Sequence, residues 1–443
     1  MSVVVRDERV EVETTQYPNG EHDDHITLMA LGRALATRGF AIECCGSCSA
    51  FRQSGMSRQM SGGAAGYCTR VGYRSTQAMV SIEHRCGEHE GHGGWTDDNA
   101  WSMDELDRRH GEVNRQGRVA AFEGAIVGLA VGDALGYPCE FRRRAHILEA
   151  FGPDGVTDFV AVHDPRWGGR PMILGPEHPP GTYTDDTQMS LAVAEALIEA
   201  GAEPLLELMD RMARRFVQWS KSPDNDRAPG SACMTGCANL ARGLSWRASG
   251  VSDSKGAGAP MRVVPIGLRY FRDRGRLLEV ARASSLPTHG HDAAVESAAA
   301  VALATALALE KRTPAEMLEA IEAECAPRSR DLAAALRKVP KLLDADPAHA
   351  LSAAGLGESW VAEELVACAL WCLTRHPGDY RAAVLAAANT DGDSDTLACV
   401  VGGIAGALHG VGAIPRAWRD GVENEQALVD VGQRLHAITF ESP

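Results

Sequence analysis

Alanine-rich segments with helical spacing dominate the chain after residue 115, where runs of β-branched residues are few. Because alanine is the best helix former, this pattern predicts a mainly all-α fold there. The lack of a fixed internal repeat favours a compact helical bundle over a solenoid. The expected helices are Ala121–Leu135, Met189–Ala200, Glu203–Ser220, Cys233–Gly243, Arg276–Ser284, Ala293–Leu309, Pro314–Glu324, Ser359–Thr374, Tyr380–Ala388, Thr396–Leu408 and Gln426–His436.

The first 115 residues differ in character and are rich in Cys, His, Gly and Ser. Apolar spacing in His25–Gly39 predicts a helix, and Phe40–Cys44 is typical of a strand, which indicates a small α+β domain. The highly charged segment Trp101–Arg118 joins this part to the rest. We therefore expect two domains, a Cys/His-rich one over 1–115 and a helical one over 116–443.

Charge and hydropathy exclude several classes of protein. The chain has 44 Lys and Arg against 59 Asp and Glu, a net charge of −15, which disfavours a broad nucleic-acid surface or attraction to an anionic membrane. The densest apolar run, Ser297–Leu309, is shorter than the roughly 20 residues that span a bilayer. The N-terminus lacks a secretory apolar segment, so we expect a cytoplasmic protein with no membrane segment.

Two acidic loops that contain threonine carry the clearest chemical signal. In the first, Thr184, Asp185, Asp186 and Thr187 stand just before an apolar helix. Such residues are favoured as helix N-caps. Adjacent carboxylates and hydroxyls are also the oxygen ligands that Mg²⁺ prefers, so this loop alone leaves both interpretations open.

The second loop contains Asp391, Asp393 and Asp395, ends in Thr396 and also precedes an apolar helix. An EF-hand starting at Asp391 is excluded, because its sixth position would be Thr396 instead of Gly and its twelfth would be Gly402 instead of Glu. Capping does not need three carboxylates. The two loops together therefore favour a pair of metal ions.

The segment Phe122–Phe141 is an apolar helix with glycines at four-residue spacing, which favours close helix packing. Asp133 and Glu140 interrupt its apolar surroundings. A carboxylate in such a setting is either paired or functional.

Two further segments suggest a ligand pocket. Gly256–Gly258 allows the backbone to approach a bulky ligand, and Arg262 offers a partner for a phosphate or for a carboxylate of the protein. His289 and His291 stand before a helix, where His291 has the alternative of being only a neighbour of the cap.

Five motifs occur in the order GLAVGDALGYPCEF, GTYTDDTQMSLAVAEAL, GAGAPMRVVPIGL, THGHDAAVESAAAVA and TDGDSDTLACVVGGIAGALHG. Together they resemble the ADP-ribosylglycohydrolases of the dinitrogenase-reductase-activating type, over about residues 118 to 440. The resemblance implies a compact all-α fold with two Mg²⁺ ions in a cleft.

The resemblance also implies roles for individual residues. Glu140 follows the GDALG motif and is implied to approach the metal centre and the ribose. The implied metal ligands are Thr184, Asp185, Asp186, Asp393, Asp395 and Thr396. The residues implied to line the ADP-ribose pocket are Gly256, Ala257, Gly258 and His289, with Arg262 as a further candidate for the diphosphate.

The implied activity is Mg²⁺-dependent hydrolysis of the bond at C1″ between ADP-ribose and an acceptor on a protein or a small molecule. The bond breaks through an oxocarbenium-like state that carboxylates commonly manage. The expected catalytic carboxylates are Glu140, Asp185, Asp186 and Asp393. The carboxylate that positions the water, and the choice among arginine, serine and nucleobase acceptors, remain open.

Two positions depart from the family pattern. Ala257 stands where the family commonly has an asparagine, which puts a hydrogen bond to the ligand in doubt, and Asp391 stands where it has a glycine. The departures keep open an alternative function, a catalytically silent module that binds or senses ADP-ribose together with a metal-binding N-terminal partner domain.

The N-terminal part contains a cysteine cluster in which Cys45 and Cys48 have the spacing of a metal-ligand pair. With Cys68 and Cys86 they form a candidate second metal site, for Zn²⁺ or an iron–sulfur cluster. The alternative is a set of thiols that hold no metal. Such a domain is expected to bind a protein partner or to select substrates.

Overall fold

The computed structural model describes residues 103–167 and 177–440 together with five short strands before them, and it describes side chains from Arg115 onward. Contacts within the chain divide it into two units, Met1–Gly117 and Arg118–Pro443, and each is described by itself.

In the first unit, β1 (Ser2–Val5) pairs antiparallel with β2 (Glu8–Glu11). A second antiparallel sheet has the order β3 (Phe51–Arg52), β4 (Ala65–Cys68) and β5 (Met79–Ser81). The predicted helix at 25–39, the predicted strand at 40–44 and the side chains of the cysteine cluster lie outside the described residues. The α+β domain and its metal site therefore stay predictions.

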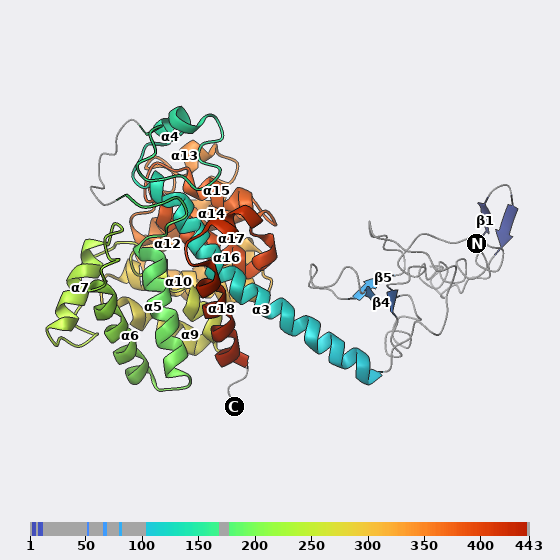
Figure 1. Cartoon of the computed structure of the whole chain (residues 1–443), viewed down its shortest axis with the longest axis horizontal. Coiled ribbons are helices and arrows are strands. Elements are labelled where there is room, and N and C mark those ends of the chain that lie inside the picture. The colour runs from blue at the N-terminus through green and yellow to red at the C-terminus, as the bar shows by residue number, and fades with distance from the viewer. Residues whose placement is uncertain are drawn as a thin grey trace. The chain divides into compact units, whose positions relative to one another are not determined.

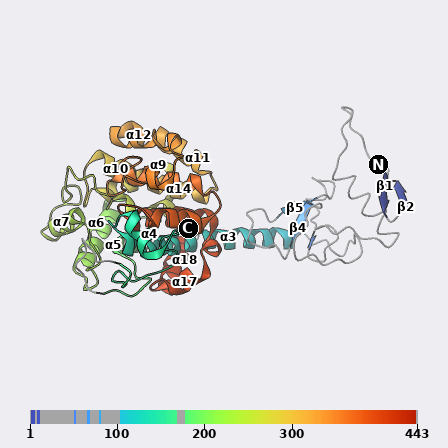
Figure 2. The ribbon, with the colours of Figure 1, turned by 90° about the horizontal axis from the view of Figure 1, so that it is seen from above.

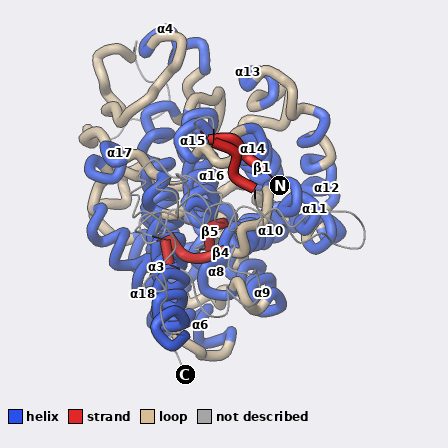
Figure 3. The backbone as a smooth tube through the Cα atoms, turned by 90° about the vertical axis from the view of Figure 1, so that its right-hand side faces the viewer, coloured by secondary structure: helices blue, strands red, loops and turns tan. Residues whose placement is uncertain are grey.

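The second unit consists of helices joined by loops, and no named strand lies between 118 and 167 or between 177 and 440 (Figures 1 and 3). The α-helices are α3 (Met103–Gly136), α4 (Arg144–Phe151), α5 (Asp185–Ala200), α6 (Leu205–Ser220), α7 (Ser231–Ala241), α8 (Val264–Tyr270), α9 (Arg274–Ser285), α10 (Asp292–Leu309), α11 (Pro314–Glu324), α12 (Arg330–Leu336), α13 (Pro347–Ala350), α14 (Ala362–Arg375), α15 (Tyr380–Ala388), α16 (Ser394–His409), α17 (Arg416–Gly421) and α18 (Glu425–Phe440). The 3₁₀ helices are η3 (Tyr137–Cys139), η4 (Pro260–Arg262), η5 (Ala326–Arg328), η6 (Val339–Lys341) and η7 (Val411–Ala413). The predicted all-α fold of this part is confirmed.

The centre of the second unit is α10, which packs against α8, α9, α14 and α16. Figure 2 shows α10 with α9 and α14 near it. Apart from the half-buried Val295, its residues from Ala293 to Ala308 are buried, which small alanines allow because they let neighbouring helices approach closely. By length and composition α10 and Arg115–Cys139 would both suit a membrane, but 83% of the apolar window of each is buried within the protein. Both helices are therefore consistent with core helices.

The contact between α3 and α16 brings the end of α3 against the second acidic loop, which contains Asp393 and Asp395. The two helices run antiparallel with their backbones touching, and a β-carbon on Gly124, Gly128, Gly132 or Gly136 of α3 would collide with the α16 backbone or the loop after it. The facing pairs are Gly124 with Gly406, Gly128 with Gly402, Gly132 with Ala398 and Gly136 with Asp395. The predicted role of the glycines in helix packing is confirmed, and the end of α3 meets the start of α16.

Candidate active site

The first acidic loop both caps a helix and supplies buried carboxylates. Thr184 is the N-cap of α5, and its hydroxyl oxygen accepts a 3.3 Å hydrogen bond from the backbone N–H of Asp186. Asp185 accepts a 3.3 Å hydrogen bond from the N–H of Gly230, whereas Oδ2 of Asp186 is buried without a hydrogen-bond partner among the described residues. Capping therefore accounts for Thr184 but not for the two carboxylates.

The second acidic loop repeats this arrangement at the start of α16. Asp393 is the N-cap and accepts a 3.3 Å hydrogen bond from the N–H of Thr396. Asp395 lies in the first turn, and its Oδ1 is also buried without a partner in the described part of the chain. Thr390 and Ser394 bond to each other at 3.2 Å and close the loop.

Asp133 joins the first acidic loop to α3. Its fully buried carboxylate accepts hydrogen bonds from the N–H of Thr184 at 2.9 Å, the N–H of Thr187 at 3.0 Å and the Thr187 hydroxyl at 2.6 Å. Burial, and then the charge of Asp395, raises the pKa of Asp133 to about 7. Asp133 is thus a paired carboxylate that positions the first loop.

The carboxylates of both loops lie close enough to repel one another. Burial raises the pKa of Asp186 well above its usual range, and the charges of Asp395, Asp185 and Asp133 raise it further. Burial and then Asp395 likewise raise the pKa of Asp185, and burial raises that of Asp393 to about 6. Repulsion among buried carboxylates is relieved by bound cations.

The donor set suits a hard divalent cation. Every predicted ligand is a carboxylate or a hydroxyl, which are the ligands that Mg²⁺ and Ca²⁺ take. The oxygens of Asp186 and Asp395 that lack a partner provide ligand positions that no donor of the described residues occupies. The residues present therefore fit the implied metal centre.

Glu140 is held beside the second loop by the backbone on both sides of it. The N–H of Phe141 donates to the carbonyl of Gly392 at 2.8 Å, and the Ser394 hydroxyl donates to the carbonyl of Cys139 at 3.5 Å. Phe141 has a φ of 52°, the left-handed region that few non-glycine residues adopt. This turn at the end of η3 places Glu140 next to the loop of Asp393, and its approach to a metal centre and a ribose stays a prediction.

The glycine-rich loop packs against a histidine of the protein. A β-carbon on Gly256 would lie 3.1 Å from Nε2 of His289, and one on Gly258 would lie 2.9 Å from its Cε1. His289 is buried, its Nδ1 lies 2.8 Å from the Thr288 hydroxyl, and burial lowers its pKa to about 3. The glycines thus make room for this neutral imidazole.

Arg262 forms no ion pair with a carboxylate among the described residues. The side chain is fully buried, and its Nη2 donates to the carbonyl of Ser284 at 3.0 Å and to the Thr288 hydroxyl at 2.7 Å. Its guanidinium lies 4.5 Å from the ring centre of Phe216. Arg262 thus holds Thr288, whose hydroxyl lies beside Nδ1 of His289, and its contact with a phosphate stays a prediction.

Asp391 contacts the start of α4 and shares the guanidinium of Arg143 with Glu358. Its Oδ1 accepts a 2.7 Å hydrogen bond from the N–H of Arg144 at the start of α4, and its Oδ2 lies 3.7 Å from the guanidinium of Arg143. The carboxylate that replaces a glycine of the family pattern therefore caps a helix.

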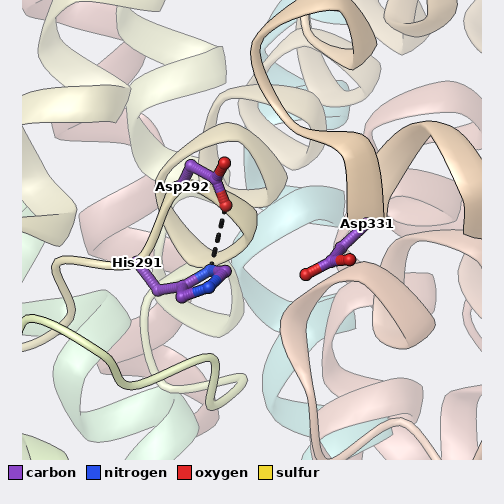
Figure 4. Close-up of side chains that lie close together, drawn as sticks. All are labelled: His291, Asp292 and Asp331. Carbon is purple, nitrogen blue, oxygen red and sulfur yellow. Dashed lines mark ion pairs between the residues drawn. The ribbon is translucent and has the colours of Figure 1, made fainter.

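A second group with metal-ligand chemistry lies at the surface. His291, Asp292 and Asp331 have ligand atoms within 4.8 Å of one another (Figure 4). However, Nδ1 of His291 accepts from the N–H of Ala293 as the N-cap of α10, and Asp331 is paired with Lys255 at 2.9 Å. His291 is therefore the N-cap itself and not a neighbour of the cap, and Asp331 comes from α12, which is distant in the sequence.

Comparisons with known proteins agree with this architecture. A family model described as ADP-ribosylglycohydrolase matches residues 114–442. An uncharacterized protein of Archaeoglobus fulgidus is 31% identical over 318 residues, which cover 72% of this chain and 96% of that protein. The ADP-ribosylarginine hydrolase Tri1 of Pseudomonas putida is 28% identical over 71% of this chain and 77% of its own length.

A solved structure described as an ADP-ribosylglycohydrolase-related protein complex has a TM-score of 0.58 and 27% identity, over 73% of this chain and 99% of that one. Sequence, motif order and helical architecture point the same way. The chain belongs to the ADP-ribosylglycohydrolase family, a class of glycosidic-bond hydrolases.

Proposed function

We propose that the helical unit hydrolyses the bond at C1″ between ADP-ribose and an acceptor, with two Mg²⁺ ions held by the two acidic loops. The proposed ligands are Thr184, Asp185, Asp186, Asp393, Asp395 and Thr396. The observation that carries the proposal is the pair of buried, unpartnered carboxylate oxygens on Asp186 and Asp395, at two helix starts that converge on Asp133.

The helix starts favour this chemistry. The N-terminal ends of α5 and α16 carry partial positive charge, which stabilises the carboxylates of Asp185, Asp186 and Asp395 in their first turns. The helix dipoles do not fully compensate the negative charge of these three carboxylates, since the pKa values of all three are raised. A divalent cation would complete the neutralisation.

The protein's own groups act on the ribose and on water. Mg²⁺ supplies Lewis-acid chemistry that orients a diol, stabilises developing negative charge and lowers the pKa of a water. One carboxylate among Asp185, Asp186, Asp393 and Asp395 accepts a proton from the attacking water. Glu140, held beside the same loop, faces the ribose as C1″ gains oxocarbenium character.

The acceptor is tested by a panel of substrates. We expect arginine-linked ADP-ribose to be the first class cleaved, because the relative Tri1 is named for ADP-ribosylarginine. Serine-linked and nucleobase-linked conjugates complete the panel, and free ADP-ribose is quantified by chromatography. Absence of release from all three classes, with Mg²⁺ present, would contradict the proposal.

One observation favours a second candidate, a silent ADP-ribose-binding module. Ala257 lacks the amide side chain common in the family, and its backbone N–H is engaged with the carbonyl of Trp360 at 3.1 Å. Calorimetry distinguishes the two functions: tight ADP-ribose binding without turnover of any conjugate would favour the module.

A further inference from the structure

A cavity of about 270 Å³ lies where α5 ends, whereas the first acidic loop lies where α5 begins. Its lining includes Gly201, directly after α5, and residues of α8 and α9. Because α5 has 16 residues that rise about 1.5 Å each, the cavity is about 24 Å along the helix from Asp185. The cavity is therefore separate from the proposed cation site.

Three arginines line this cavity, namely Arg269, Arg272 and Arg276. Arg276 is paired with Glu279 at 2.7 Å, whereas Arg269 and Arg272 form no ion pair with a carboxylate of the described residues. Arg269 donates to the carbonyl of Gly201 at 3.1 Å, but its Nε has no hydrogen-bond partner in the described part of the chain. Arg272 is exposed, and its guanidinium donates to no acceptor in that part of the chain. The cavity therefore has cationic donors that the described residues leave unused.

The acidic residues of the lining, Glu203 and Asp273, are engaged elsewhere. Both carboxylate oxygens of Glu203 accept hydrogen bonds from Arg211 on α6, at 2.6 and 2.7 Å. Asp273 is the N-cap of α9 and accepts a 3.0 Å hydrogen bond from the backbone N–H of Arg276. Once these ion pairs are set aside, two arginines face one carboxylate, and the local charge favours an anion although the whole chain carries −15.

Aromatic rings hold the two arginines that lack a carboxylate. The guanidinium of Arg272 lies 4.4 Å from the ring centre of Phe440 on α18 and 5.2 Å from that of Phe271. The guanidinium of Arg269 lies 5.2 Å from the ring centre of Tyr270. An arginine that contacts a ring through the face of its guanidinium keeps the N–H groups at the edge available to an acceptor. Both side chains are thus ordered before any ligand binds.

We propose that this cavity binds a small phosphate-containing anion through Arg269 and Arg272. Guanidinium groups recognise phosphate oxygens because their paired N–H donors match the spacing of two oxygens. The net charge of −15 opposes a polymeric polyanion, whose many phosphates would meet an acidic surface outside the cavity. The ligand is therefore a free phosphate or diphosphate compound. The inference does not depend on the proposed hydrolysis, since the cavity lies at the other end of α5.

Calorimetry of the full chain with inorganic diphosphate tests the site. The titration is done in EDTA, so that no Mg²⁺ at the acidic loops can bind the anion. We expect saturable binding to wild type and an affinity weakened about tenfold or more in Arg272→Ala and in Arg269→Gln. The matched control is Arg247→Ala, which removes an exposed arginine that lies 4.0 Å from the ring centre of Trp246, outside the cavity. Its affinity should remain within about twofold of wild type, because remote exposed charges are screened.

Three results would overturn the proposal. The first is no diphosphate binding by wild type, either in calorimetry or as a rise in Tm. The second is an equal loss of affinity in Arg247→Ala and Arg272→Ala, which would reflect net charge and not the cavity. The third is an oligonucleotide that binds more tightly than diphosphate and loses affinity in Arg272→Ala, which would replace the small ligand by a nucleic acid. Arg272 is exposed, so its substitution tests the site even if Arg269→Gln fails to fold.

Discussion

The hydroxyl of Thr187 on α5 donates a 2.6 Å hydrogen bond to the carboxylate of Asp133 on α3. Thr187 follows Asp185 and Asp186 directly, and Thr184 on their other side also donates to Asp133 through its N–H. The positions of Asp185 and Asp186 therefore depend on Asp133, which is not itself a proposed metal ligand.

Asp133→Asn should impair both stability and activity, because an amide group would place its own N–H hydrogens against backbone donors. Leaving such buried groups unpaired costs about 1–3 kcal/mol. We expect a lower Tm and at least a tenfold loss of ADP-ribose release. Thr187→Ser, which keeps the hydroxyl, serves as the conservative control, and Asp133→Asn with unaltered activity would contradict this role.

Asp186→Asn should stabilise the cation-free protein while abolishing its activity. The substitution removes one charge from a group whose members repel one another and are buried. We expect a higher Tm in EDTA at pH 8 than for wild type, and no increase in Tm when Mg²⁺ is added. A variant that Mg²⁺ still stabilises as much as wild type would argue against Asp186 as a ligand.

Stability without cations should fall as the pH rises from about 4 to about 7. Burial raises the pKa of Asp393 to about 6 and that of Asp133 to about 7, from 3.8, so the folded protein binds protons that the unfolded chain has released. The stabilisation is complete below the unfolded pKa and is lost as each folded pKa is passed.

Cation binding should show the opposite dependence on pH, because the carboxylates must ionise to bind. We expect Mg²⁺ to raise Tm more at pH 8 than at pH 5, as measured by differential scanning fluorimetry in parallel samples with Mg²⁺ or EDTA. An equal increase in Tm at both pH values would show that these carboxyl groups do not titrate with cation binding.

Gly132→Ala should be strongly destabilising. A methyl group at this position would collide with the backbone of Ala398 on α16, and neither helix backbone can move away without breaking its own hydrogen bonds. We expect a loss of about 1–3 kcal/mol or more, in urea unfolding. Gly117→Ala is the matched control in the same helix, because its β-carbon meets nothing within 4 Å, and it should leave stability unchanged or slightly increased.

Asp391→Ala should cost about 1 kcal/mol of stability through the lost cap on α4. Asp391→Asn retains an oxygen that can accept from the Arg144 N–H and should remain near wild type. Neither change should alter Mg²⁺ affinity by more than about twofold, since the Asp391 carboxylate is engaged by the Arg144 N–H and the Arg143 guanidinium. A large loss of affinity in Asp391→Asn would instead place this residue in the cation site.

Local pattern was sufficient for most of the helical fold. Ala-rich spacing predicts α10 and α15 nearly to the residue, because these helices form their own caps and bury alanine, whereas α5 begins four residues before its predicted start at Met189. The start of α4 is different, since its cap comes from Asp391, which lies 247 residues from Arg144 in the chain. Propensity alone contains no information on such a partner.

The site divides in the same way. The carboxylates of both acidic loops are visible in sequence because each loop is contiguous. The hydrogen bonds from Arg262 to Thr288 and from the Ala257 N–H to the Trp360 carbonyl join segments that are distant in the chain, so no local pattern predicts them. The positive φ of Ser359 has no sequence signature either.

The most direct test of the central claim is the release of free ADP-ribose from an arginine-linked conjugate by the full chain, measured with Mg²⁺, with EDTA and after Mg²⁺ is restored. We predict release with Mg²⁺, loss of at least a hundredfold in EDTA, recovery on restoration, and no release by the double variant Asp186→Asn, Asp395→Asn. Release that is unaffected by EDTA and by the double variant would contradict a cation-dependent hydrolase built on these two loops.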